Sequence, residues 1–212
     1  MKFARSASSL LAGSLALALL GCGGGGGGGL SNKNPGNNDV NVVVAFGDSI
    51  TQGKECPCTP YPERLAGMIG KNVLNTGIGG SLAVENVGRA QSAIDKYHPG
   101  FMIILYGVND VINGYGLDAI SSALDAMVSV CYDNHVVPVL ATYPRCISEH
   151  AIFGSRTSRL NEHIKAVASS RGVKCVDLES EFNANPEWYM PDGLHPNDAG
   201  TQVMALAFAD LF

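Results

Sequence analysis

The chain has 212 residues, of which 46% are hydrophobic and 16% are charged, with a formal net charge of −5. Basic residues form no cluster, so nucleic acid and anionic lipid head groups are poor candidates as partners. The length allows one domain with a proper hydrophobic core, together with residues that do not belong to it.

The first twenty-two residues have the pattern of an export signal. A short basic head precedes an apolar run from Leu10 to Leu20, which is too short to span a bilayer comfortably. The run ends at Leu19-Leu20-Gly21-Cys22, which resembles a bacterial lipobox, where the cysteine is acylated and becomes the new N-terminus. We expect a lipoprotein-type signal peptide over residues 1–22 with Cys22 as the lipidated residue. The alternative is ordinary secretory cleavage.

Residues 23–39 are expected to form a flexible tether. They begin with the unbroken glycine run Gly23–Gly29 and continue with Asn, Ser, Gly and Pro, so they bury too little apolar area to offset the entropy of ordering. The folded body is then residues 40–212. This organisation predicts an exported protein of the bacterial cell envelope, lipid-anchored on the periplasmic or surface face, with the body held off the membrane. We expect a monomer.

Five apolar runs of strand length alternate with helical patterns through the body. Strands are expected at residues 40–46, 72–75, 101–106, 136–142 and 173–178. Helices are expected at residues 62–69, 84–97, 117–134, 155–171 and 197–212. This alternation implies parallel strands with right-handed crossovers, hence an α/β fold with a three-layer α/β/α sandwich. Pattern alone does not fix the strand order, and we adopt 2-1-3-4-5 as a common order for doubly wound sheets.

In that order the first strand lies between the second and third, so the segments that follow these three strands are neighbours at the carboxyl edge. The segments are Gly47-Asp48-Ser49, Asn75-Thr76-Gly77-Ile78-Gly79-Gly80 and Gly107-Val108-Asn109-Asp110. They offer a hydroxyl, a glycine-rich backbone that can approach a ligand closely, and a side-chain amide. Taken singly, each is also an ordinary turn, loop or helix cap.

A fourth polar segment, Asp192-Gly193-Leu194-His195-Pro196, follows the last strand. An aspartate three residues before a histidine in a tight turn can hydrogen-bond the imidazole Nδ1, which leaves Nε2 free to accept a proton. His150 is a further candidate, because the loop after the fourth strand is expected at the rim of the site. Trp188 and Tyr189 are expected either to line a substrate pocket or to pack beneath the turn.

The four segments together resemble the hallmark blocks of the SGNH/GDSL hydrolases, GDS, NxGxxG, GxND and DxxHP, and the resemblance covers residues 42–207. It implies a flavodoxin-like 2-1-3-4-5 sheet. It also implies that Ser49 is the nucleophile, that His195 is general base and then general acid, and that Asp192 orients His195. No metal or organic cofactor is needed for this chemistry.

The resemblance also assigns an oxyanion hole. Its donors are the backbone N–H of Ser49, the backbone N–H of Gly80 and the side-chain amide of Asn109. Gly79 is the weaker candidate, because the last glycine of the block is the one that matches. Donors of this kind are each worth about 3 to 4 kcal/mol of transition-state stabilisation.

The expected function is hydrolysis of carboxylic esters through an acyl-Ser49 intermediate. The substrate class is open among small acyl esters, a lysophospholipid or another lysolipid, and an acetylated glycan. Bulk triglyceride is disfavoured because no long hydrophobic insert separates the blocks. Two other classes of function are considered: a binding module that has kept the fold and lost the chemistry, and a redox lipoprotein that uses Cys56 and Cys58.

Five cysteines fall in the body, at positions 56, 58, 131, 146 and 175, so an exported protein can form at most two disulfides. Cys56-Pro57-Cys58 has no second close pair and is therefore not a zinc knuckle. We expect a disulfide bond between this segment and Cys146, since both loops should lie at the same end of the sheet. The segment from Gly53 to Pro60 is expected to be a variable loop that shapes the substrate cleft.

Overall fold

The computed structural model describes residues 35–212; the predicted signal peptide, Cys22 and most of the predicted tether lie outside these residues. The described chain forms one five-stranded parallel sheet in the order β2-β1-β3-β4-β5, which confirms the predicted order. The strands are β1 (Asp39–Gly47), β2 (Asn72–Asn75), β3 (Pro99–Leu105), β4 (Val137–Ala141) and β5 (Lys174–Val176).

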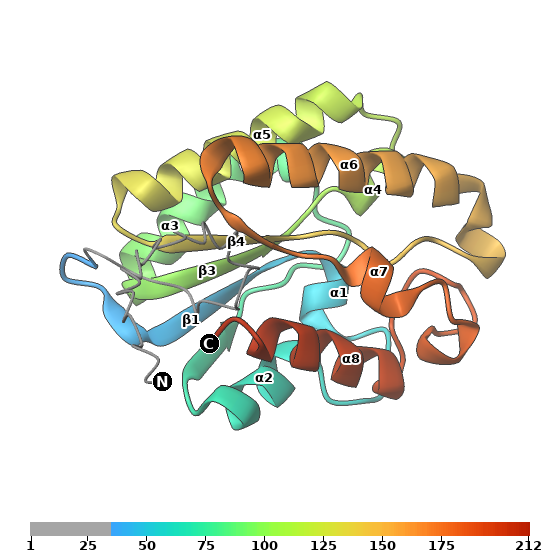
Figure 1. Cartoon of the computed structure of the whole chain (residues 1–212), viewed down its shortest axis with the longest axis horizontal. Coiled ribbons are helices and arrows are strands. Elements are labelled where there is room, and N and C mark those ends of the chain that lie inside the picture. Colours follow the sequence, from blue (N-terminus) through green and yellow to red (C-terminus); the bar gives the residue numbers. More distant parts are fainter. Residues whose placement is uncertain (1–34) are drawn as a thin grey trace, which may run out of the picture.

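Helices cover both faces of the sheet, as the α/β/α prediction requires (Figure 1). On one face α2 (Tyr61–Ile69) packs against α8 (Asp198–Ala209), while the other face carries α3 (Val87–Tyr97), α5 (Leu117–Asp133) and α6 (Gly154–Arg171). None of the helices described in residues 35–212 combines the length and the apolar character needed to cross a membrane.

Burial explains why β1 and β3 form the centre of the sheet. Every residue of β3 is buried, and so are the last five residues of β1, whose side chains are mostly β-branched or aromatic. Such continuous apolar runs suit strands that are covered on both faces. The exposed residues of β1 lie at its start, so its carboxyl end is the end that lies in the core.

Short helices that were not predicted occupy several of the turns. They are α1 (Ser49–Gln52), α4 (Val108–Ile112), α7 (Leu178–Phe182) and the 3₁₀ turns η1 (Ala83–Glu85), η2 (Ser148–Phe153) and η3 (Pro186–Trp188). The predicted strand 173–178 is therefore too long, because the Asp177 side chain caps α7 and ends the extended backbone. The predicted helix 84–97 is divided into η1 and α3 at Asn86.

The register of the central strands aligns their carboxyl ends. Gly47 at the end of β1 is opposite Leu105 at the end of β3, and Ala45 is opposite Asn75 at the end of β2. Two further backbone bonds, Thr76 N–H to Ala45 O and Ile78 N–H to Gly47 O, continue this pairing past β2. The three polar segments therefore leave the sheet side by side.

Candidate active site

The nucleophile candidate lies in a sharp turn between β1 and α1. The Asp48 carboxylate caps α1 by accepting a hydrogen bond from Ile50 N–H at 2.9 Å, which places Ser49 in the first turn of the helix. Tyr143 donates its hydroxyl to the other oxygen of Asp48 at 2.6 Å. Asp48 and Tyr143 are fully buried, whereas Ser49 keeps 8% of its surface exposed. Buried contacts therefore hold the turn on its inner side, while the Ser49 side chain remains partly accessible to solvent.

Asp48 has a raised pKa, which the sequence did not reveal. Complete burial raises the pKa of its carboxyl from an ordinary 3.8 to about 6, although the hydrogen bonds from Tyr143 and Ile50 lower it in part. The folded protein therefore holds the Asp48 proton more tightly than the unfolded chain does. The stability that this proton provides is fully present below about pH 4 and is lost as pH rises through 6.

Asp48→Asn should remove this part of the pH dependence of stability. Between about pH 4.5 and pH 7.5, ionisation of Asp48 should lower the free energy of unfolding of the wild type by about 2 kcal/mol relative to the variant. Urea denaturation of both proteins at both pH values gives this difference directly. Other titrating groups cancel because both proteins contain them. Parallel pH profiles for the two proteins would show that Asp48 is ionised throughout.

The histidine candidate completes a chain of three side chains. Ser49 Oγ lies 2.9 Å from His195 Nε2, and His195 Nδ1 lies 2.6 Å from Asp192 Oδ2. Asp192 Oδ1 also accepts the backbone N–H groups of Leu194 and His195. Partial burial raises the pKa of Asp192, but the hydrogen bonds from His195 and this backbone outweigh it, so its pKa is lowered. A carboxylate only accepts, so Nδ1 carries the proton and Nε2 of neutral His195 can accept from Ser49.

The loop after β4 supports the Asp192 turn from outside. Ile147 N–H donates to Gly193 O, and His150 Nδ1 donates to Asp192 O at 2.9 Å. Gly193 has a φ of 70°, and a side chain there would approach Ile147 O to 2.2 Å, so only glycine fits. His150 therefore lies at the rim as predicted, although its ring contacts the backbone of the turn. Arg145, in the same loop, is exposed.

Trp188 and Tyr189 pack beneath the turn, which was one of the two predicted alternatives. Both rings meet Phe182 edge-on, and Tyr189 donates its hydroxyl to Arg145 O at 2.9 Å. Tyr189 also forms an isolated antiparallel bridge with Pro196, directly after the histidine candidate. These contacts fix the position of the turn from the side of α7.

The glycine-rich segment after β2 lies directly against the nucleophile turn. A side chain at Gly77 would approach the backbone nitrogen of Gln52 to 2.2 Å, so the two backbones are in contact there. A Cβ at Gly79 would lie 3.9 Å from Ser49 Cβ. Gly80, the predicted donor, has a φ of 72°, which favours glycine. The segment that carries Gly79 and Gly80 is thus brought beside Ser49.

Asn109 and Asp110 hold the far end of this segment. Asn109 donates one amide N–H to Ser81 O at 3.2 Å, which leaves its second N–H for another acceptor. Asp110 is fully buried and accepts the backbone N–H groups of Ala83 and Val84 at 2.8 and 3.1 Å. The predicted side-chain donor, Asn109, is therefore hydrogen-bonded to the residue that follows the predicted backbone donor, Gly80.

Arg89 on α3 was missed by the sequence-based prediction, although it binds two of the three segments and the residue that precedes the third. It donates to Thr76 O at 2.8 Å, to Gly47 O at 3.5 Å and to the Tyr106 hydroxyl. Its guanidinium carbon lies 4.1 Å from the centre of the Phe46 ring. A basic residue within an amphipathic helix pattern gives no sign of this role, because only the fold shows which carbonyls it reaches.

The predicted disulfide between the Cys56–Cys58 segment and Cys146 is wrong. Cys56 and Cys58 are bonded to each other, with Cα atoms 5.2 Å apart, within the usual reach of a disulfide. Cys146 is a buried free thiol whose Sγ lies 3.3 Å from Thr157 Oγ1 on α6. Cys131 and Cys175 are also free. Cys146 faces α6 and not the Cys56 turn, and this direction could not be read from its position at the same edge of the sheet.

This fold, together with a hydrogen-bonded serine, histidine and aspartate at the carboxyl edge of the sheet, is that of serine-dependent hydrolases. A sequence model of the GDSL-like lipase/acylhydrolase family matches residues 45–203, and the chain belongs to this family. The protein is therefore a carboxylic-ester hydrolase. Within the described residues, no group of three or more His, Cys, Asp or Glu side chains is arranged to hold a metal ion.

Two similar sequences are named esterases. An arylesterase of Vibrio mimicus is 26% identical over 162 residues, which cover 73% of this chain and 79% of that protein. A multidomain esterase of Ruminococcus flavefaciens is 28% identical over 183 residues, which cover 80% of this chain but only 23% of that protein. The second similarity is thus to one part of a much longer chain.

Solved structures of similar fold extend the comparison. A G-D-S-L family protein from Desulfitobacterium hafniense superposes with a TM-score of 0.71 at 22% identity, covering 81% of this chain and 99% of that one. An acetylxylan esterase from Geobacillus stearothermophilus superposes with a TM-score of 0.67 at 22% identity, covering 81% and 93%. At this level of identity, the structures establish a shared fold.

Proposed function

We propose that the protein hydrolyses carboxylic esters by transferring the acyl group to Ser49 and then to water. The observation that carries the proposal is the continuous chain from Ser49 Oγ through both ring nitrogens of His195 to Asp192. His195 takes the Ser49 proton during attack on the ester carbonyl and gives it to the departing alcohol. Water then attacks the acyl-serine, with His195 as base again.

The oxyanion that forms in each step is assigned to three donors: the backbone N–H of Ser49, the backbone N–H of Gly80 and the side-chain amide of Asn109. The approach of Gly79 to Ser49 and the bond from Asn109 to Ser81 support this assignment. Donors fixed before the reaction stabilise developing charge without reorganisation. Arg89 and Asp110 act as positioning residues, since both bind the backbone of the donor segments.

We assign small acyl esters, with a lysolipid or an acetylated glycan as the alternatives, as the substrate class. The pocket beside Ser49 and His195 encloses about 210 Å³ of empty space, including its opening to solvent, which favours a compact ester. The similar proteins named arylesterase and acetylxylan esterase also act on esters, as their names state. A binding module without chemistry is disfavoured by the intact hydrogen-bonded trio.

The proposal is tested with p-nitrophenyl esters from acetate to longer acyl chains, before and after treatment with an activated phosphonate ester, which phosphonylates nucleophilic serines and releases its leaving group. Turnover of the acetate ester should disappear as one phosphonyl group is added to the peptide that contains Ser49. Labelling of another serine with loss of activity would reject Ser49 as the nucleophile. A folded protein that hydrolyses none of the esters would move the choice to acetylated glycans, assayed by acetate release.

We also propose that the protein is anchored to the bacterial envelope through lipid on Cys22. The support is the sequence pattern of residues 1–22 and the glycine run that follows it. In cells fed radiolabelled palmitate, the wild type should carry label and sediment with membranes, and Cys22→Ala should do neither. An unlabelled wild type would indicate ordinary secretory cleavage. Cys175→Ser is the matched control, because that thiol belongs to the folded body.

A further inference from the structure

The small pocket beside the nucleophile has a wall that only the loop after α1 provides. Ser49 and His195 line it, Glu55 and Cys56 form its wall on the side of this loop, and Pro196 and Thr201 are also part of the lining. Cys56 is 9% exposed, and the disulfide to Cys58 holds it against the pocket. Without the disulfide, the loop between Gly53 and Pro60 could adopt several conformations and the wall would have no fixed position. The disulfide restricts the loop and so sets the position of the wall.

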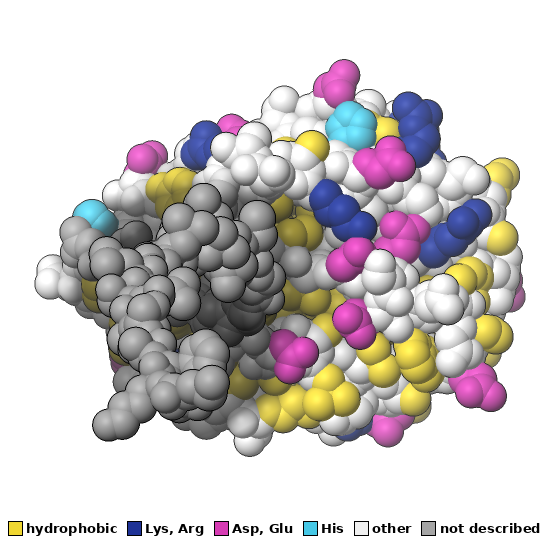
Figure 2. Space-filling view, in the orientation of Figure 1, with side chains coloured by type: hydrophobic (Ala, Val, Ile, Leu, Met, Phe, Trp, Pro, Cys, Tyr) yellow, Lys and Arg dark blue, Asp and Glu magenta, His cyan; other side chains and the backbone are white. Residues whose placement is uncertain are grey.

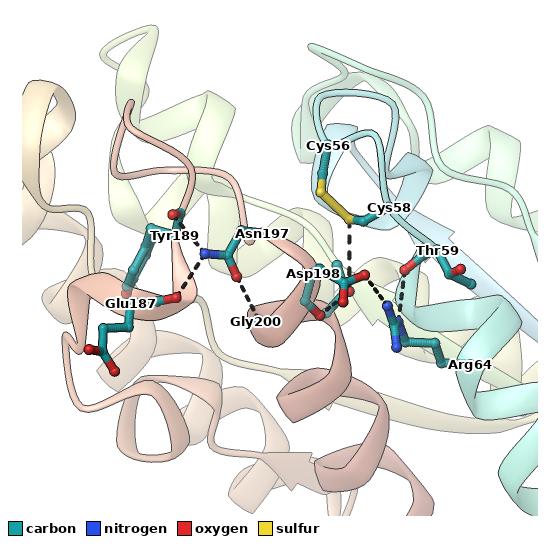
Figure 3. The surroundings of a disulfide bond; sticks show 10 residues. Cys56, Cys58, Thr59, Arg64, Glu187, Tyr189, Asn197, Asp198 and Gly200 are labelled. Carbon is teal, nitrogen blue, oxygen red and sulfur yellow. Dashed lines mark hydrogen bonds and ion pairs between the residues drawn. A yellow bond between two sulfur atoms is a disulfide. The ribbon is translucent and has the colours of Figure 1, made fainter.

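The disulfide turn is fastened to two helices of the same face (Figure 3). Cys58 Sγ lies 4.0 Å from Thr201 Oγ1 on α8. Arg64 on α2 donates to Thr59 O at 3.0 Å, and its guanidinium also reaches Asp198 at the start of α8. The loop therefore contacts both α2 and α8 at and just after the second cysteine, and these contacts hold the wall of the pocket in place.

The position of the pocket relative to His195 indicates which part of an ester enters it. In the tetrahedral intermediate the oxyanion faces Gly80 and Asn109, and neither residue lines the pocket. The departing oxygen must face His195 Nε2, which supplies its proton. Ser49 and His195 both line the pocket, whereas Gly80 and Asn109 do not, so the pocket lies on the side of the departing oxygen and receives the group attached to it.

We infer that this pocket is the leaving-alcohol subsite of the hydrolase and that the Cys56–Cys58 disulfide limits the size of the alcohol it admits. The inference rests on the proposed ester hydrolysis at Ser49 and specifies it: compact alcohols or phenols are accepted, and bulky ones are excluded by the disulfide wall. Acyl-chain length is set elsewhere, on the side of the site that the disulfide does not touch.

The experiment compares two phenyl acetates that carry a para-methyl or a para-tert-butyl group, because their phenols have nearly the same acidity and differ in bulk. For the wild type, kcat/KM should favour the methyl compound. Cys56→Ser/Cys58→Ser should raise the ratio of tert-butyl to methyl by about tenfold, the usual scale for steric discrimination in a pocket. Wild type reduced with a phosphine, then freed of the reagent, should show the same shift with two additional titratable thiols. If the double variant does not fold, the ratio measured for the reduced wild type tests the inference in its place.

Two controls distinguish a change at the alcohol subsite from a non-specific increase in the flexibility of the whole active site. Cys175→Ser, which removes a free thiol on β5, should keep the wild-type ratio. The ratio of p-nitrophenyl butyrate to acetate should remain within about twofold of wild type in the double variant, because the alcohol is constant. An unchanged tert-butyl ratio, or a shift confined to the acyl series, would overturn the inference. Loss of the proposed function is distinct: the wild type would hydrolyse neither phenyl acetate.

Discussion

Replacing Ser49 with alanine should lower kcat for p-nitrophenyl acetate by a factor of about 10⁵ to 10⁶, the scale seen when a serine nucleophile is removed. Without Oγ there is no atom to receive the acyl group, and the remaining donors can only polarise the ester. The folded structure should tolerate the change. The only hydrogen bond of the Ser49 side chain in the described structure is the one to His195, so the free energy of unfolding should change by no more than about 1 kcal/mol.

The matched control is Ser92→Ala, because Ser92 is exposed on α3 and, within residues 35–212, its hydroxyl bonds only to Gly88 O of its own helix. For both variants, urea denaturation gives the free energy of unfolding, and steady-state kinetics with p-nitrophenyl acetate gives kcat. Ser92→Ala should match wild type in both assays. Turnover by Ser49→Ala above about one hundredth of the wild-type rate, with contamination excluded by mass spectrometry, would place the nucleophile elsewhere.

Asp192→Asn should lower kcat by a factor of about 10⁴, by analogy with the corresponding change in serine proteases. The asparagine oxygen can still accept Leu194 N–H and His195 N–H, so the turn itself should persist. Its amide group would instead face His195 Nδ1 and donate to it. Nε2 would then carry the imidazole proton and could not accept one from Ser49.

Nitrogen chemical shifts of the His195 ring distinguish this mechanism from simple unfolding. In the neutral ring, the wild type should show protonated Nδ1 and unprotonated Nε2, and the variant should show the reverse. Asp210→Asn, at the C-terminal end of α8, is the control and should retain wild-type shifts and turnover. A loss smaller than about tenfold in Asp192→Asn would mean that His195 is oriented mainly by its backbone surroundings.

The sheet and the reactive side chains were predictable because their signals are local. Continuous apolar runs identify β1 and β3, and the four ordered blocks identify Ser49, Asn109, Asp192 and His195 without any knowledge of the packing. The sheet order then brings residues 49 and 195 together, which the Ser49–His195 bond confirms as a contact. Their catalytic roles stay predictions until the variants are measured.

The supporting groups were not predictable, because their partners are set by tertiary packing. Tyr143 meets Asp48 across 95 residues of chain, and the hydroxyl of one and the carboxylate of the other give no pairing signal in the sequence. The same holds for Arg89 and the carbonyls of Thr76 and Gly47. α1 and α7 are too short to show a helical period, and each depends on the side-chain cap of one aspartate.

The contact between Ser49 and His195 joins two segments that lie far apart in the chain. The serine turn follows β1, whereas Asp192 and His195 follow β5, which ends at Val176. A chain that stopped after β5 would therefore contain all five strands and the serine but would lack the acid–base pair. Ester hydrolysis accordingly depends on the segment between β5 and α8, whose backbone is held by the hydrogen bond from Asn197 N–H to Trp188 O.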